Sequence, residues 1–210
     1  MDASKPSNMR QAYELSYRKA CGALMHSDLG EISRRTGAVQ NGGTLWVAYF
    51  GSRVEIQVSE PEPQFTPQEL PLAEKILILH YLTGPGAERG LPRPESDRLV
   101  SFKNLPGAAF YGVPYQNRGP GRIARRFGTS PEEFRRAGSA LGWTPEAMGD
   151  LAFSFQVLPR IRGVVVLHLG DEELPAEAGI LHNQAIVSYL PLEDVAVLGG
   201  LIATRLTRAL

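Results

Sequence analysis

The sequence contains 210 residues, of which 22 are Lys or Arg and 22 are Asp or Glu, so its formal net charge at pH 7 is zero. A chain of this length buries roughly 70% of the surface that its unfolded form exposes, and it can fold without covalent cross-links. Cys21 is the single cysteine, which excludes an intramolecular disulfide, a zinc ribbon and an iron–sulfur cluster built within this chain.

The sequence predicts a cytoplasmic protein. No uninterrupted apolar run approaches the roughly 20 residues that span a bilayer, and residues 1–10 lack the apolar core of a secretory signal. The low cysteine content is typical of a reducing compartment. We therefore expect neither export nor insertion into a membrane.

The first 40 residues predict a helical arm. Apolar side chains recur at helical spacing over residues 9–25 with charged residues between them, which indicates an amphipathic helix. A second short helix is predicted over residues 28–35, with Gly37 as its C-terminal glycine. We expect this arm, residues 1–40, to pack on a single α+β domain that comprises the whole chain, residues 1–210.

A β-hairpin is predicted over residues 44–58. Apolar residues alternate on both sides of the dipeptide Gly51-Ser52, which suits a two-residue type II′ turn because glycine comes first. With this turn Phe50 would pair with Arg53, and six apolar side chains would gather on one face of the ribbon.

The middle of the chain combines a buried helix with irregular segments. Residues 72–82 are apolar on nearly every side and predict a helix in the interior. Residues 84–94 are rich in Gly and Pro and predict a surface loop. Residues 98–103 predict a strand, and the proline breaks and aromatic anchors of residues 105–121 predict an ordered but irregular segment.

The last part of the chain predicts two helices, then two apolar strands and a final helix. Capping residues predict one helix over residues 130–142 and a short helix over residues 144–149. Two strands follow, at residues 151–157 and 164–169, joined by a hairpin loop of several residues; the second is apolar on both faces, as a central strand is. A final helix begins at Pro191, with acidic residues in its first turn and basic residues in its last.

The strands occur in hairpins and do not alternate with helices as in β-α-β units. We therefore predict the α+β class, with a mostly antiparallel sheet of about five strands and helices packed against it.

Basic charge is concentrated in residues 89–136, which carry 10 Lys or Arg and 4 Asp or Glu, whereas residues 41–88 carry 2 and 6. Arginines with aromatic neighbours can bind phosphate, a carboxylated ligand or RNA. Glu132 and Glu133 lie in the same stretch, so we expect these charges to meet each other or water, and nucleic acid not to be a partner.

The common catalytic signatures are absent from the sequence, among them the Walker loop, G-x-G-x-x-G after a strand, H-E-x-x-H and G-x-S-x-G. The acidic run of residues 171–173 follows the expected central strand, where sheet proteins often place functional side chains. Adjacent carboxylates favour a hard cation or a raised pKa on one member; the alternative is a solvated turn that Asp171 caps. We expect Arg160 or Arg162 to pair with Asp171 in a structural salt bridge.

Metal ligation is not predicted. The residues that could contribute ligands are His80, Asp171 and His182, but no two of the four histidines have a helical metal spacing. No cofactor is identified by the sequence.

Four segments in this order and spacing resemble the family known as domain of unknown function 3786. They are residues 76–82 (ILILHYL), 101–107 (SFKNLPG), 149–160 (GDLA with Phe155 and LPR) and 170–175 (GDEELP). The similarity extends from about residue 10 to the end of the chain.

The resemblance implies a domain found mainly in anaerobic bacteria and archaea, in which some relatives carry a cysteine-rich iron–sulfur module and are associated with corrinoid or carbon-monoxide metabolism. This chain departs from those relatives because one cysteine cannot hold a cluster. A corrinoid or iron–sulfur protein, or a small anionic ligand, is the partner that the resemblance favours.

Three functions are compatible with these observations. The first is a non-catalytic accessory or ligand-binding protein for anaerobic cofactor or metalloprotein chemistry. The second is a metal-assisted hydrolase or lyase that uses the loop of Asp171 and Glu172 with His182. The third is a protein-interaction module that uses the hairpin face carrying Trp46 and Phe50. For the first function the residues expected to line a ligand pocket are Tyr81, Phe102, Lys103, Arg160, Asp171 and Glu172.

Overall fold

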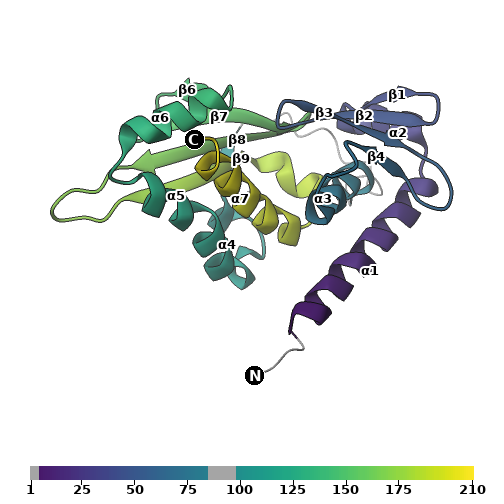
Figure 1. The fold of residues 1–210 in the computed structure, drawn as a ribbon, viewed down its shortest axis with the longest axis horizontal. Helices are drawn as coiled ribbons and strands as arrows, with labels where there is room; N and C mark the ends of the chain where they lie inside the picture. The colour runs from purple at the N-terminus through teal and green to yellow at the C-terminus, as the bar shows by residue number, and fades with distance from the viewer. Residues whose placement is uncertain (1–4, 85–97) are drawn as a thin grey trace. The chain divides into compact units, whose positions relative to one another are not determined.

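The structure is a computed structural model that describes residues 5–84 and 98–210. The chain divides into two units. The first unit comprises Met1–Arg93, Leu158–Arg160 and Ser188–Pro191, and the second comprises Pro94–Val157, Ile161–Val187 and Leu192–Leu210. The predicted α+β class is confirmed, with two antiparallel sheets of four and five strands in the order β1-β2-β3-β4 and β5-β9-β8-β7-β6 (Figure 1). The extent of a single domain and of its N-terminal arm stays a prediction, and the loop expected at residues 84–94 lies almost wholly outside the described residues.

The first unit contains three helices and the four-stranded sheet. The helices are α1 (Lys5–Met25), α2 (Leu29–Thr36) and α3 (Leu72–Thr83), and the strands are β1 (Val39–Asn41), β2 (Thr44–Tyr49), β3 (Ser52–Gln57) and β4 (Gln64–Thr66). Gly37 ends α2 at φ 77°, as predicted. Asp28, expected inside this helix, is its N-cap and accepts a hydrogen bond from the N–H of Glu31 at 2.8 Å. α1 packs along α3, whose apolar side chains are buried on nearly all sides, as the sequence predicts.

The hairpin between β2 and β3 turns one residue earlier than expected. Phe50 and Gly51 both have positive φ, 48° and 78°, which is the geometry of a type I′ turn rather than the type II′ turn that glycine in first place suggested. Tyr49 therefore pairs with Ser52, and the predicted pairing of Phe50 with Arg53 is wrong. Because the register moves by two residues, an even number, the same apolar side chains still face the same side.

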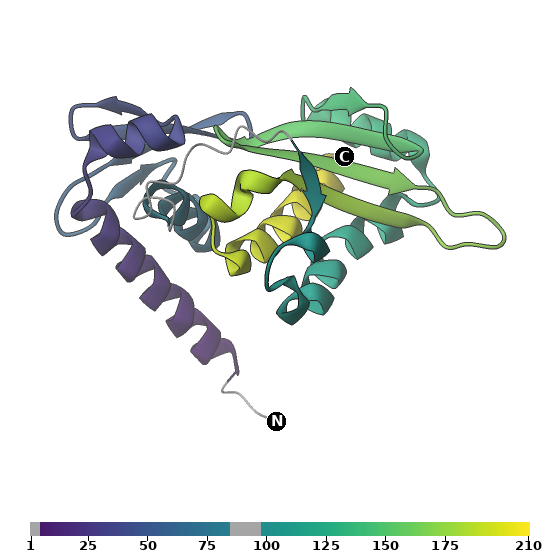
Figure 2. The same cartoon turned by 180° about the vertical axis from the view of Figure 1, so that it is seen from behind.

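The second unit contains the five-stranded sheet and its helices. Its strands are β5 (Leu99–Ser101), β6 (Thr144–Glu146), β7 (Leu151–Leu158), β8 (Ile161–His168) and β9 (Glu177–Asn183). Its α-helices are α4 (Gly112–Arg118), α5 (Pro120–Phe127), α6 (Pro131–Ala140) and α7 (Leu192–Thr207), and its 3-10 helices are η1 (Phe102–Asn104), η2 (Ala108–Phe110) and η3 (Gln184–Ser188). Helices α4, α5 and α7 pack against one another, and α5 lies on β8 and β9 (Figure 1, Figure 2).

Three sequence-based expectations for the second unit change. Residues 144–146 form an edge strand and not the first turn of a helix, because β7 offers backbone pairing whereas a helix of five residues has a costly nucleus and no apolar face. The β7–β8 connection has two residues and is tighter than the expected loop. Strand β9 was not predicted, because its short sequence contains Gly179 and Asn183 and lacks a clear alternation. β8 lies third of five strands, as expected of a central strand.

Aromatic side chains join the sheet of the second unit to its helices. Phe134 of α6 contacts both Phe127 of α5 and Phe153 of β7, with ring centroids 5.6 and 5.5 Å apart. Trp143 stacks on Phe155 at 4.0 Å. Since alternate residues of a strand face opposite sides, the opposite face of this sheet carries a separate apolar cluster, composed of Ala152, Val164 and Val166 with Leu99 and Leu181 beside them.

Candidate functional site: a pocket at the β5–β9 edge

A gap in strand pairing creates an opening at the edge of the five-stranded sheet. β5 pairs with β9 only from Leu181 to Asn183, because the chain leaves the sheet after Ser101 and enters η1. β9 itself continues back to Glu177 and is paired there with β8 on its other side. Residues 177–180 therefore form a strand edge in the described structure, at which alternate residues direct their N–H and C=O groups out of the sheet.

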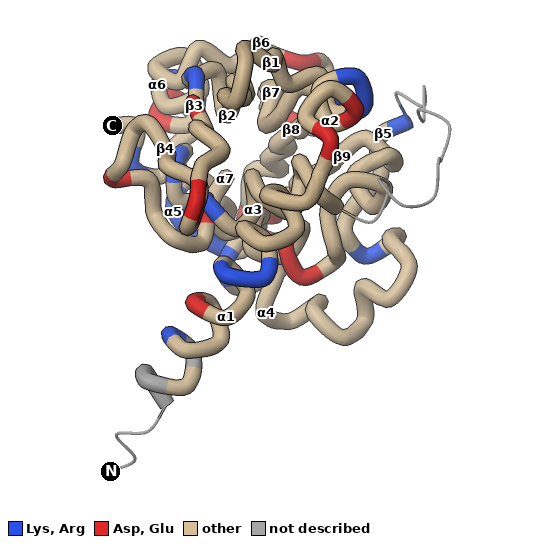
Figure 3. Tube along the Cα trace, turned by 90° about the vertical axis from the view of Figure 1, so that its right-hand side faces the viewer, with Lys and Arg blue, Asp and Glu red and all other residues tan. Residues whose placement is uncertain are grey.

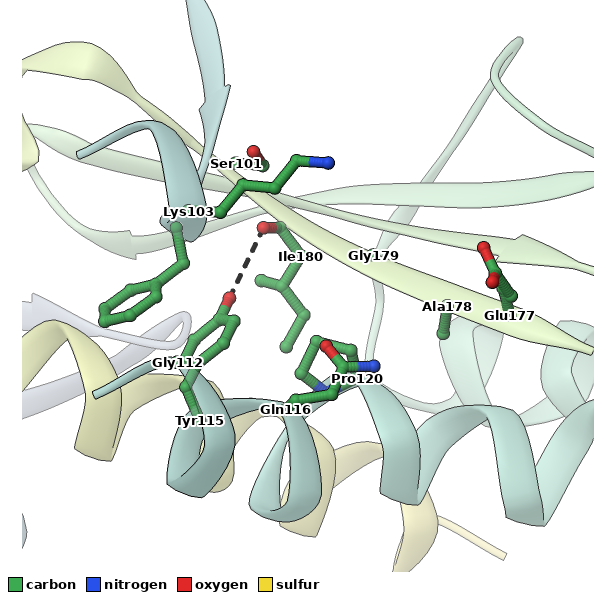
Figure 4. Close-up of a pocket in the computed structure, with 11 residues that line it drawn as sticks. Ser101, Lys103, Gly112, Tyr115, Gln116, Pro120, Glu177, Ala178, Gly179 and Ile180 are labelled. Carbon is green, nitrogen blue, oxygen red and sulfur yellow. Dashed lines mark hydrogen bonds between the residues drawn. The ribbon is translucent and has the colours of Figure 1, made fainter. Parts of the chain in front are cut away.

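A cavity of about 370 Å³ lies at this edge, a volume at the lower end of the range typical of small-molecule sites. Figure 4 shows Ser101 and Lys103 at one end of β9's exposed edge and Glu177 at the other, with Gly179 and Ala178 between them. The cavity is lined by Ser101, Phe102, Lys103, Gly112, Tyr115, Gln116, Pro120, Glu177, Ala178, Gly179 and Ile180.

An aromatic pair forms one wall of this cavity. Phe102 stacks on Tyr115 with ring centroids 4.1 Å apart and planes 14° from parallel. Gly199 of α7 makes room for the tyrosine ring, because a Cβ atom at that position would lie 2.4 Å from Tyr115 Cε2. Close packing among η1, α4 and α7 thus holds this aromatic wall in place.

The hydroxyl of Tyr115 is held only loosely. It donates to the carbonyl oxygen of Ile180 at 3.4 Å (Figure 4), which is long for an O–H···O hydrogen bond. Burial raises the pKa of Tyr115 well above its ordinary value, so the group stays a neutral donor. Because this bond is weak, the hydroxyl can turn to a ligand at small cost.

Polar groups around the cavity are incompletely satisfied. Ser101 Oγ is buried and has no hydrogen-bond partner within residues 5–84 and 98–210. Lys103 and Glu177 are exposed, and neither forms an ion pair in the part of the chain that the structure describes. A cation, a hydroxyl and a carboxylate therefore border one cavity without partners of their own.

The lining residues do not form an activated nucleophile. A catalytic serine needs a general base within hydrogen-bond reach, roughly 2.6–3.2 Å, and Ser101 Oγ has no such neighbour among the described residues. The arrangement is suited to holding a ligand.

The six residues predicted to line a pocket separate into three places. Phe102 and Lys103 line the edge cavity of the second unit. Tyr81 and Arg160 contact each other in the first unit, where the N–H of Arg160 donates to the hydroxyl of Tyr81 at 3.1 Å. Asp171 and Glu172 lie in the exposed loop between β8 and β9.

The surroundings of Tyr81 are those of a structural tyrosine. Its buried hydroxyl donates to the carbonyl oxygen of Thr36 while accepting from Arg160, so both its functions are used. Burial raises the pKa of Tyr81 well above its ordinary value. Arg35, which sequence reasoning did not select, lies nearby: it donates to the carbonyl of Leu82, its Nε and Nη1 are buried without partners among the described atoms, and burial lowers its pKa.

The acidic loop forms a turn capped by Asp171, which is the alternative that the sequence left open. Asp171 Oδ1 accepts hydrogen bonds from the N–H groups of Leu174 at 2.8 Å and Glu173 at 2.9 Å. These donors hold the pKa of Asp171 below its ordinary value, whereas crowding of carboxylates was expected to raise the pKa of one member. The expected pairing of Asp171 with Arg162 is wrong, because Arg162 forms its ion pair with Glu146.

The metal-ligand candidates are not gathered into a site. Among the described residues no group of three or more His, Cys, Asp or Glu is placed to hold a metal ion. His182 is fully buried on β9, and neither ring nitrogen has a hydrogen-bond partner in residues 5–84 and 98–210. Burial lowers the pKa of His182 to about 4. His80 lines a second cavity, of about 330 Å³, in the first unit with Lys19 and Thr83.

Three arginines of the basic stretch pair with two of its own carboxylates. Arg126 and Arg136 pair with Glu133, and Arg135 pairs with Glu132. In Figure 3 the blue of Lys and Arg and the red of Asp and Glu are interspersed along the trace. This agrees with the expectation that these charges meet each other.

Sequence reasoning missed several residues of the edge cavity, chiefly Ser101, Tyr115, Gln116 and Glu177. The sequence holds little to identify these residues as neighbours. A pocket at a strand edge depends on where β5 stops pairing with β9, and β9 itself was not predicted. The break from an alternating strand into Leu105-Pro106-Gly107 was the one local sign that β5 would be short.

The fold and the cavity define an α+β protein with an open sheet edge beside a small pocket. By sequence, the chain belongs to the family described as a domain of unknown function, DUF3786, whose model matches residues 28–205. No curated protein and no solved structure matches the chain. None of the described helices is long and apolar enough to cross a membrane.

Proposed function

We propose that this protein is a non-catalytic ligand-binding protein that holds a small, carboxylate-bearing molecule in the β5–β9 edge pocket. The observation that carries the proposal is the set of unpartnered polar groups around one cavity, namely the ammonium of Lys103 and the buried hydroxyl of Ser101. Leaving a buried hydroxyl unsatisfied costs about 1–3 kcal/mol, which a ligand oxygen would offset. Lys103 supplies the charge that selects an anion.

The shape of the cavity favours a compact ligand. Its volume of about 370 Å³ suits a molecule at the small end of the usual range, and Phe102 with Tyr115 provides an apolar wall against which such a molecule can lie. The loosely held hydroxyl of Tyr115 adds a donor. A carboxylate near Lys103 would then have up to three donors around it.

Titration followed by backbone amide chemical shifts tests this proposal. Acetate, succinate and N-acetylalanine are added in turn to the wild-type protein, to Lys103→Gln and to Lys19→Gln, an exposed lysine of the first unit. We expect shifts confined to residues that line the edge pocket, and binding about fivefold weaker in Lys103→Gln only. Ligand recovered chemically unchanged supports the non-catalytic role. Absence of shifts at Ser101, Lys103 and Gly179 with every carboxylate would contradict the proposal.

An accessory role in anaerobic cofactor or metalloprotein chemistry, in the cytoplasm, is the second part of this proposal. It is supported by the family resemblance and by the single cysteine, since a partner would have to supply any cluster. Anaerobic purification from a native source, followed by an absorption spectrum and metal analysis, checks it. We expect a coloured corrinoid or iron–sulfur protein to accompany the chain; a colourless, metal-free preparation without a second protein would rule this part out.

A further inference from the structure

The edge pocket contains features that a simple carboxylate would not use. At the end of the cavity away from Lys103 stands a carboxylate, Glu177, which has no ion pair within the described residues. Between these two charges runs the edge of β9 that pairs with no other strand in the described part of the chain (Figure 4). A ligand that fills the cavity would therefore meet a cation, a row of peptide groups and an anion, in that order.

The backbone of this edge is arranged to pair with another peptide. The carbonyl of Ile180 points out of the sheet, toward Tyr115. Because successive residues of a strand direct their peptide groups to alternate sides, the N–H and C=O of Ala178 point to the same edge as those of Ile180. Extended peptides bind to such edges by adding a strand, with main-chain hydrogen bonds supplying the contacts.

The length of the edge sets the length of its occupant. From Glu177 to Ile180 the strand advances three residues, about 10 Å at about 3.3 Å per residue. An extended tripeptide spans a similar distance between its terminal amine and its terminal carboxylate. Small residues, Gly112, Pro120 and Gly179, are among those that line the cavity, and its volume is modest, so a peptide with small side chains fits best.

We propose that the edge pocket binds short zwitterionic peptides, of about three small residues, which add to β9 as a parallel strand. Charge fixes the direction: the peptide carboxylate lies at Lys103 and its amine at Glu177. The opposite, antiparallel direction would place the amine beside Lys103 and the carboxylate beside Glu177, and both contacts are repulsive. This inference rests on the proposed function, because it assigns the ligand class of the same pocket.

A set of four peptides and three variants, one of them a control, tests the assignment. The probes are trialanine, trialanine amide, N-acetyltrialanine and N-acetyltrialanine amide, titrated into the wild-type protein and followed by calorimetry and amide chemical shifts. We expect a Kd for trialanine on the order of 1 mM or below. Blocking either terminus is expected to weaken binding about fivefold.

The variants separate the two ends of the peptide. In Lys103→Gln, trialanine and its amide should bind equally, because the carboxylate contact is already lost. In Glu177→Gln, trialanine and its N-acetyl form should bind equally. Glu172→Gln, at an exposed glutamate of the β8–β9 loop, is the matched control. In this variant, blocking either peptide terminus should weaken binding as much as it does in the wild type.

The outcomes distinguish this inference from the proposed function. Succinate binding as tightly as trialanine, with no effect of acetylation in any protein, would overturn the peptide assignment and leave a carboxylate pocket in place. If neither peptides nor carboxylates shift the amides of Ser101, Gly179 and Ile180, both proposals fail. Protection of the Ile180 amide from hydrogen exchange by trialanine, and not by succinate, supports strand addition.

Discussion

Tyr81 in the first unit and Tyr115 in the second are both buried tyrosines, yet their hydroxyls are used differently. Tyr81 donates to the carbonyl of Thr36 and accepts from Arg160, so its hydroxyl is fully engaged. The hydroxyl of Tyr115 makes one long hydrogen bond among the described residues, to the carbonyl of Ile180 at 3.4 Å, and lies beside an open cavity. A hydroxyl with all its hydrogen bonds formed stabilises the native chain. A weakly bonded hydroxyl beside a cavity remains available to a ligand.

His182 extends this comparison, because it is a buried polar side chain whose ring nitrogens have no hydrogen-bond partner among the described residues. Its pKa of about 4 lies below the roughly 6.5 of an unfolded chain, so the unfolded state takes up the proton first. The contribution of neutral His182 to the free energy of unfolding is fully present above about pH 6.5. It decreases by roughly 3 kcal/mol as the pH falls to about 4. Denaturant unfolding between pH 4 and 8 measures this loss, which we expect to be the largest of the effects considered.

The control for the pH effect is a pair of histidine variants. His182→Leu removes the titrating ring and should show a flatter dependence on pH than the wild type, and His168→Gln, at an exposed position, should not. Equal pH profiles for the wild type and His182→Leu would mean that another group is responsible.

Exchanging each tyrosine for phenylalanine tests the comparison directly. Tyr81→Phe leaves the Thr36 carbonyl and the Arg160 N–H without their partner, so we expect a loss of about 2 kcal/mol in the free energy of unfolding. Tyr115→Phe removes one long contact and should cost less than about 1 kcal/mol while weakening trialanine binding. Thermal and urea unfolding provide the measurement; equal losses in the two variants would remove the distinction between them.

Two adjacent glycines of α7 sharpen the comparison on the side of the pocket. An added Cβ at Gly199 would lie 2.4 Å from the Tyr115 ring, whereas at Gly200 its nearest neighbour is Arg118 Cβ at an ordinary 3.6 Å. Overpacking by the added methyl group costs about 1–3 kcal/mol, and the higher helix propensity of alanine offsets part of this cost. For Gly199→Ala we therefore expect a net decrease of about 1 kcal/mol in the free energy of unfolding. Gly200→Ala should be up to about 1 kcal/mol more stable than the wild type.

Ligand binding distinguishes these two glycine variants further. Gly199→Ala displaces the tyrosine that forms the cavity wall and should weaken trialanine binding, while Gly200→Ala should bind as the wild type does. Unchanged affinity in Gly199→Ala would show that the aromatic wall does not contact the ligand.

The smallest effect is expected for the acidic loop between β8 and β9. Asp171→Ala removes two hydrogen bonds within an exposed turn, and water can replace them. We expect a small decrease in the melting temperature and no change in trialanine binding or metal content. Loss of a bound metal ion in Asp171→Ala, measured by elemental analysis, would instead return the loop to consideration as a site.

Local patterns in the sequence identify the elements that depend on nearby residues. The helix capped by Asp28 and Gly37, the buried helix α3 and the central strand β8 follow from capping, composition and apolar patterning, and the structure confirms them. Lys103 and Phe102, which were predicted to line a ligand pocket, both line the edge cavity, and their role in binding stays a prediction. The hairpin turn at Phe50 and Gly51 was placed one residue late, because either of two turn types suited the dipeptides there.

The sequence alone determined the class of the fold and the residues that lie in its interior, because the order of apolar and polar side chains indicates which of them are buried. Only the tertiary structure decided which polar residues would lie together. Pairing between β5 and β9 stops after Ser101, and that end point brings Lys103, Tyr115 and Glu177 around one cavity although they are distant in the chain. Strand pairing between remote segments depends on the packing of the whole unit, which no local pattern records.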